Sequence, residues 1–195
     1  MKAEKGFTLI EILVSLIILG FGLLGLAGMQ ISGMKNATDS VYRTTASMLA
    51  RDLADRMHAN PRGVDNDGYI KEDDTAINCE SAVPAKNCDI GGAQCDVDET
   101  AVWDMFSVYC GGVGGSPDDK RYGIASQLPN GKLQVFCQDM DTTDADVCSH
   151  FSPHRILITW LERAELTGKQ KKNAGESDPA ANAKTRTFEL VVSVR

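Results

Sequence analysis

The chain lacks charged side chains over a long N-terminal stretch. No Asp, Glu, Lys or Arg occurs from Ile12 to Met34, a run of 23 residues. At about 1.5 Å per residue, a helix of this length can cross a bilayer core of roughly 30 Å. The run is longer than the apolar part of an ordinary secretory signal, and no small-x-small cleavage site follows it. The sequence therefore predicts one membrane-spanning helix.

An excess of positive charge is also missing. The formal net charge is −7, which argues against nucleic acid or an anionic membrane surface as the main partner. Lys169, Lys171 and Lys172 give little support for DNA binding on so acidic a chain. No nucleic-acid partner is expected.

Enzyme motifs are absent around the three histidines. Neither an HExxH motif nor a serine in a nucleophile-elbow context accompanies His58, His150 or His154. A membrane-anchored enzyme or ligand sensor in the periplasm is the alternative from a different functional class, and this absence weighs against it. The sequence predicts no enzymatic activity.

One carboxylate stands at the start of the apolar stretch. Glu11 follows the segment Gly6-Phe7-Thr8-Leu9-Ile10. A carboxylate inside a membrane span costs at least a few kcal/mol, so such residues are rare and usually serve a function. The alternative is a plain signal anchor with a misplaced glutamate near the cytoplasmic interface.

A short charged leader that ends in Gly6, the segment Phe7–Glu11 and an unbroken apolar helix together resemble the N-terminus of type IV prepilins and type II secretion pseudopilins. The resemblance implies that a prepilin peptidase cuts between Gly6 and Phe7 and that the new Phe7 amine is methylated. It also implies that Glu11 neutralises the terminal amine of a neighbouring subunit. The physics agrees, since a buried carboxylate is tolerated when an opposite charge meets it.

The chain is predicted to have four parts. They are a cleaved leader (1–6), a transmembrane and filament-core half of the N-terminal helix (7–34), an amphipathic half of the same helix (35–60) and a periplasmic globular domain (61–195). Lys2 and Lys5 favour a cytoplasmic N-terminus. We expect a single-pass protein of the inner membrane that enters the extracellular pilus after assembly.

Helical periodicity follows the apolar stretch. Between Tyr42 and Met57 apolar residues recur at spacings of three and four, and Asn60-Pro61 ends the pattern. Asp96 and Glu99 have the spacing of a capping box at the start of a shorter helix, and Gly111 marks its end. The predicted apolar face of this shorter helix consists of Val102, Met105, Phe106 and Tyr109.

The period changes to two in the C-terminal part. Leu128-Pro129-Asn130-Gly131 reads as a turn with a hairpin signal, and alternating segments follow at 133–137, 156–160 and 188–194. Residues 164–184 are polar and are interpreted as a long exposed connection. The predicted fold is α+β. By resemblance it is the type IV pilin fold, in which a long N-terminal helix, transmembrane in its first half, packs on an antiparallel sheet.

All six cysteines lie beyond the apolar stretch, as expected for disulfides in an oxidising compartment. The resemblance implies a loop closed by Cys137 and Cys148. For the others, both a Cys79–Cys88 and a Cys88–Cys95 bond remain open. A Cys95–Cys110 bond is awkward because it would join the two ends of the shorter helix.

Two metal sites are weighed against simpler interpretations. Asp65, Asp67 and Asp74 fall in register with an EF-hand loop, but its first position is Gly63 and its twelfth is Asp instead of Glu. An acidic turn is preferred to a calcium site, here and at the acidic residues between Cys137 and Cys148 (Asp139, Asp141, Asp144 and Asp146). For zinc, the candidate ligands Cys148, His150 and His154 lack a CxxC pair, and a disulfide accounts for Cys148 more simply. No cofactor is expected.

A wider resemblance concerns the C-terminal part. Trp103, the segment Leu128–Gly131, the strand that ends at Cys137 and the segment Ile156–Trp160 together resemble the PilV family of minor pilins. This implies a low-abundance subunit that forms a priming complex with other minor pilins and the assembly machinery of the inner membrane. It also implies contact with the major pilin and a role in adhesion near the pilus tip. The alternative within the class is a minor pseudopilin of type II secretion.

Overall fold

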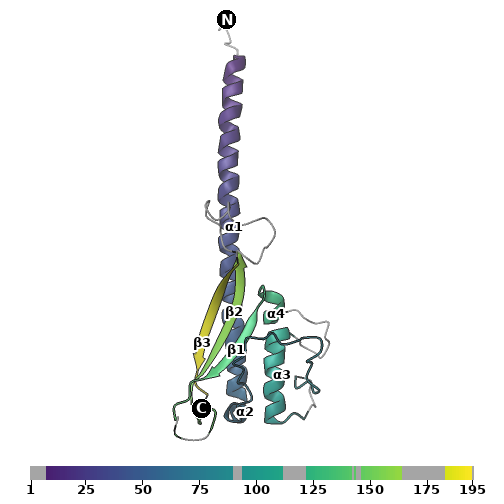
Figure 1. Cartoon of the computed structure of the whole chain (residues 1–195). Coiled ribbons are helices and arrows are strands. Elements are labelled where there is room, and N and C mark those ends of the chain that lie inside the picture. Colours follow the sequence, from purple (N-terminus) through teal and green to yellow (C-terminus); the bar gives the residue numbers. More distant parts are fainter. Residues whose placement is uncertain are drawn as a thin grey trace. The chain divides into compact units, whose positions relative to one another are not determined.

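A computed structural model describes residues 8–89, 94–111, 122–141, 143, 146–163 and 183–194 (Figure 1). The chain divides into two compact units, Met1–Val41 and Tyr42–Arg195. The helices are α1 (Leu9–Ala59), α2 (Pro61–Asp65), α3 (Val97–Cys110) and α4 (Ile124–Gln127). The strands are β1 (Lys132–Cys137), β2 (His154–Arg163) and β3 (Ala183–Val192). One long helix with a small antiparallel sheet confirms the α+β prediction.

The first unit consists of the N-terminal part of α1. By length and composition, α1 is the one helix in the described ranges that is long and apolar enough to cross a membrane. Its apolar side chains point outward all round, and residues as large as Leu9, Phe21 and Met34 are more than two-thirds exposed. Within a single chain, this segment therefore has no apolar environment of its own.

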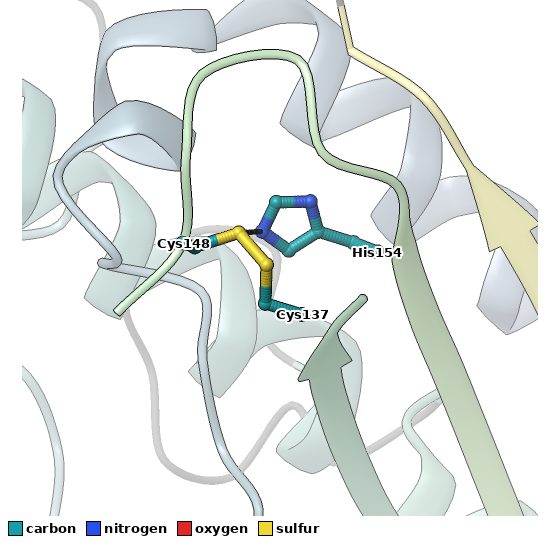
Figure 2. Close-up of side chains that lie close together, drawn as sticks. All are labelled: Cys137, Cys148 and His154. Atoms are coloured by element: carbon teal, nitrogen blue, oxygen red, sulfur yellow. Dashed lines mark hydrogen bonds between the residues drawn. A yellow bond between two sulfur atoms is a disulfide. The ribbon is translucent and has the colours of Figure 1, made fainter. Parts of the chain in front are cut away.

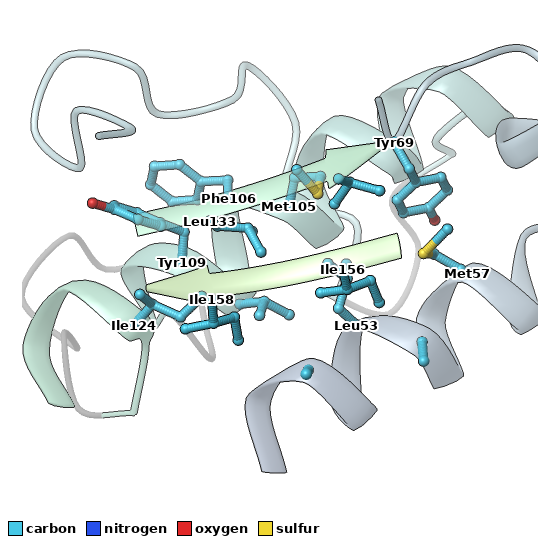
Figure 3. Close-up of a cluster of buried hydrophobic side chains, with 14 of the residues drawn as sticks. Leu53, Met57, Tyr69, Met105, Phe106, Tyr109, Ile124, Leu133, Ile156 and Ile158 are labelled. Carbon is cyan, nitrogen blue, oxygen red and sulfur yellow. The ribbon is translucent and has the colours of Figure 1, made fainter. Parts of the chain in front are cut away.

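In the second unit, α1 becomes amphipathic. Ala46, Ala50, Leu53 and Met57 are fully buried and form one stripe at helical spacing. Figure 3 shows Leu53 and Met57 next to Ile156 of β2, in the cluster that forms the core. The helix ends at Ala59, and the chain turns at once into α2 with Pro61 at its start. There the missing N–H of proline costs no hydrogen bond.

The sheet has the order β1-β2-β3, and both pairs are antiparallel. Leu133 lies opposite Ile158, and Val135 lies opposite Ile156, so alternate residues of β1 and β2 are buried together. The predicted meander is confirmed. Most of the predicted connection 164–184 lies outside the described residues.

Helix α3 has the predicted ends. Asp96 accepts hydrogen bonds from the N–H groups of Asp98 and Glu99, and Glu99 accepts one from the N–H of Asp96, which completes the capping box. Gly111 ends the helix with a φ of 71°. The predicted apolar face was wrong at one position. Val102 is exposed and Trp103 is buried, because the helix is covered on more than one side and a single stripe does not describe it.

The Asn-Gly turn has a different role from the predicted one. It connects the four-residue helix α4 to β1 instead of joining two strands. Asn130 has a φ of 50°, and a Cβ on Gly131 would lie 2.7 Å from the Cγ2 of Ile124, so the turn lies tightly against α4. The local turn was predicted correctly, but the element before it has only four residues and leaves no periodic signal.

The disulfides correct part of the expected pairing. The bonds are Cys79–Cys110, Cys88–Cys95 and Cys137–Cys148. Cys79–Cys88, which was left open, does not form, and Cys79–Cys110 was not considered. That bond joins residues 31 apart, because the loop after α2 returns to the C-terminal end of α3.

A buried polar network joins α1, the segment after α2 and α3. The Nη1 of Arg56 donates to Asp104 at 3.0 Å, and the hydroxyl of Tyr69 donates to the second oxygen of Asp104 at 2.6 Å. The Nδ2 of Asn60 donates both to Tyr69 and to the carbonyl of Val97. Burial and the bond to Asp104 raise the pKa of Tyr69, so its phenol stays protonated and remains a donor.

Replacing Tyr69 by Phe should destabilise the second unit by about 1–3 kcal/mol, because a buried carboxylate oxygen and an amide donor each lose a partner. The measurement is urea unfolding of the full chain in detergent micelles, followed by the fluorescence of the buried Trp103 and Trp160. The control is Tyr122→Phe at an exposed position, which should change little. If Tyr69→Phe and Tyr122→Phe unfold at the same urea concentration, the network does not stabilise the second unit.

Removing the long-range disulfide should cost more than removing the local one. The Cys79→Ala/Cys110→Ala variant should lose about 3.5 kcal/mol and the Cys88→Ala/Cys95→Ala variant about 2.5 kcal/mol, because the larger closed loop restricts the unfolded chain more. The same urea unfolding measures both. A larger loss from the local pair would show that packing around Cys88, not loop length, dominates.

Candidate functional site

Glu11 lies in the first turn of α1 and is exposed in the single chain. Its N–H donates to the carbonyl of Thr8 at 3.1 Å, which places the carboxylate near the positive end of the helix dipole. Its neighbours Ile10 and Ile12 are at least half exposed. In the described part of the chain, no ion pair involves Glu11.

The two predicted processing residues, Gly6 and Phe7, lie outside the described residues. The structure therefore describes Glu11 and its apolar neighbours, but not the predicted cleavage site. A carboxylate with apolar neighbours can gain a charge partner only from a group that is not fixed in this helix. Such a group can belong to another chain, which is the arrangement the N-terminal resemblance implies.

The three EF-hand candidates have different surroundings. Asp65 ends α2 and pairs with His150 at 2.9 Å, and Asp74 pairs with Lys132 at 2.7 Å. Asp67 has a φ of 60° in the turn that follows α2, as the preferred acidic turn requires. In the described ranges these carboxylates do not form a group that could share one cation. The acidic turn stays the preferred interpretation, and calcium binding stays the untested alternative.

The acidic loop between Cys137 and Cys148 uses its carboxylates internally. Asp139 accepts a hydrogen bond from the N–H of Ser149 at 3.1 Å and another from its hydroxyl, so these bonds lower the pKa of Asp139. Asp141 likewise accepts from the N–H and hydroxyl of Thr143, which lowers its pKa. Asp144 lies outside the described residues.

Cys137, Cys148 and His154 form the one group of three potential metal ligands found in the described ranges (Figure 2). Their ligand atoms lie within 4.8 Å of one another, but the two sulfurs are bonded to each other. Of the predicted zinc candidates, His150 is not in the cluster, because it pairs with Asp65. Of the three zinc candidates, the structure therefore brings together Cys148 and His154, and Cys137 is the third member of the cluster.

His154 is buried, and it lies two residues before the predicted alternating segment 156–160. It is the first residue of β2 and lies on the same face as Ile156, Ile158 and Trp160, all of them buried. The alternating pattern from 154 to 160 could have revealed this orientation. Its contact with a disulfide that begins 17 positions earlier could not be read from the sequence.

Two family models match consecutive parts of the chain. The prokaryotic N-terminal methylation motif matches residues 1–27, and the Tt1218-like family, described as type IV pilin Tt1218, matches residues 28–106. No curated protein and no solved structure matches the chain. Type IV pilins are structural proteins and not enzymes. The matches, together with the long apolar helix and the antiparallel sheet, support a type IV pilin that carries an N-terminal methylation motif.

Proposed function

We propose that this chain is a minor pilin of the PilV type, which helps to start pilus assembly and can contribute to adhesion at the pilus tip. The wider resemblance of residues 103–160 to PilV proteins supports the minor-pilin assignment. The observation that carries the assembly role is Glu11, a carboxylate without an ion-pair partner in the described chain, on a helix that is apolar on all sides. Its partners in this role are other minor pilins, the major pilin and the inner-membrane assembly machinery.

The proposed steps follow the N-terminal sequence. Prepilin peptidase removes residues 1–6 and exposes the amine of Phe7, which is then methylated. In the assembled complex, Glu11 pairs with the N-terminal amine of a neighbouring subunit. Because the surroundings are apolar, the attraction is stronger than it would be in water, and a chain that lacks either charge is disfavoured.

The proposed topology places the N-terminus in the cytoplasm and the second unit in the periplasm. The 23 uncharged residues from Ile12 to Met34 support a span of the inner membrane. The three disulfides of the second unit support an oxidising compartment for that unit. In an assembled pilus the same unit would lie outside the cell.

Changing Gly6 to Ala or to the bulkier Val should block maturation, because the peptidase must accept the residue that precedes the cut. The expected result is an uncut precursor in the inner membrane. The measurement is the intact mass of the purified protein, together with N-terminal mass spectrometry for methylated Phe7. The control is Gly20→Ala, whose added methyl group meets no atom within 4 Å and should leave cleavage unchanged. Normal cleavage of Gly6→Val would refute the processing site.

Changing Glu11 to Ala, or to the isosteric but neutral Gln, should reduce co-purification with partner pilins by roughly tenfold or more, as expected when one member of a buried ion pair is removed. Membrane insertion should be unchanged. Ser15→Ala, one turn further along α1, is the control, because it removes a polar group and no charge. Equal co-purification of Glu11→Gln and the unchanged chain would exclude the charge-pairing role.

A further inference from the structure

In the oxidised protein, the contact between Cys148 and His154 cannot be a hydrogen bond. The Nδ1 of His154 lies 3.1 Å from the carbonyl oxygen of Ser152. Since a carbonyl can only accept, Nδ1 carries the proton. In the neutral ring, Nε2 is then an acceptor, and it lies 3.6 Å from the sulfur of Cys148.

A disulfide sulfur has no proton to donate. Nε2 is therefore an acceptor in a buried position that faces an atom unable to donate (Figure 2). The same contact becomes a hydrogen bond when Cys148 is a thiol, because the S–H can then point at Nε2. The geometry around His154 thus suits the reduced form, from which the disulfide is made.

We propose that His154 is the general base for closing the Cys137–Cys148 disulfide, accepting the proton of the Cys148 thiol during oxidation. The thiolate, not the thiol, attacks sulfur, so a base at hydrogen-bond distance raises the reactive fraction. The surroundings support the transfer. Asp65 and Asp67 both interact electrostatically with His154, and their negative charges favour its protonated form.

Burial acts in the opposite direction and lowers the pKa of His154, which keeps the ring neutral and ready to accept before the reaction. Among the described residues, the titratable groups that face the ring are Asp65 and Asp67, from α2 and the turn after it, and the two cysteines. The imidazolium forms when the thiolate forms beside it, as an ion pair.

The exposure of the two sulfurs gives the order of events. Cys137 is half-buried and Cys148 is buried, so a disulfide oxidant meets Cys137 first. The thiolate of Cys137 attacks the oxidant, forms a mixed disulfide and releases one thiolate. Cys148 then gives its proton to His154 and attacks the Cys137 sulfur, and the second half of the oxidant leaves as a thiolate that takes up a proton. In sum, two protein thiols and one oxidant disulfide give one protein disulfide and two thiols.

The first test uses the full chain in detergent micelles with Cys137 changed to Ser, which leaves Cys148 as the single free thiol and keeps the other two disulfides. The rate of alkylation by iodoacetamide is measured against pH, with a metal chelator present. With His154 in place, the midpoint should lie about one pH unit or more below that of the His154→Gln variant. His58→Gln, on α1, is the matched control and should not move it. Equal midpoints with and without His154 would overturn the proposal.

The second test follows closure itself in the chain with all six cysteines. The reduced chain is mixed with oxidised glutathione, quenched with acid and mapped by mass spectrometry. In His154→Gln, the mixed disulfide at Cys137 should accumulate and Cys137–Cys148 should close roughly threefold to tenfold more slowly at pH 7. The Cys79–Cys110 and Cys88–Cys95 bonds of the same molecules are internal controls. Equal slowing of all three bonds would show a general folding defect and refute the specific role.

Discussion

The constraint on which the rest depends is that one continuous helix meets two environments. From Ile12 to Met34, α1 shows mostly apolar side chains on every side, and from Tyr42 it buries a single stripe of small and apolar residues. Each pattern is stable only in its own surroundings. The first requires hydrocarbon or the apolar faces of other helices, and the second requires the sheet and α3. The position at which the pattern changes therefore determines which part of the chain folds by itself.

The two kinds of surroundings explain where polar groups can be placed. In the second unit, Asp104 is buried, but Arg56 and Tyr69 supply a charge and a donor within the same chain. Glu11 is exposed in the single chain, between apolar neighbours, and has no such partner among the described residues. The contrast is physically informative, because a buried carboxylate is stable only when it is paired. Folding therefore supplies the partners of Asp104, whereas the proposed partner of Glu11 belongs to another subunit.

Sequence reasoning succeeded where the signal is local. The apolar run, the capping box at Asp96 and the alternation in β1 and β2 each follow from residues within one element. It failed where the answer depends on which distant segments meet. Nothing in the sequence near Arg56 identifies Asp104, 48 residues later, as the partner that it meets in the folded protein. The Cys79–Cys110 bond was missed for the same reason, since nothing near either residue identifies the other.

The position of His154 depends both on a local sequence pattern and on a contact between distant segments. Its alternation with Ile156 and Ile158 directs the ring inward, and the antiparallel register places it opposite Cys137. A ring at that position has one nitrogen for the backbone of Ser152 and one for the sulfurs. A leucine could fill the same space without the cost of burying a polar ring. The arrangement is therefore better explained by the chemistry of the sulfurs beside it than by packing, and it connects the end of the sheet to the covalent closure of the loop.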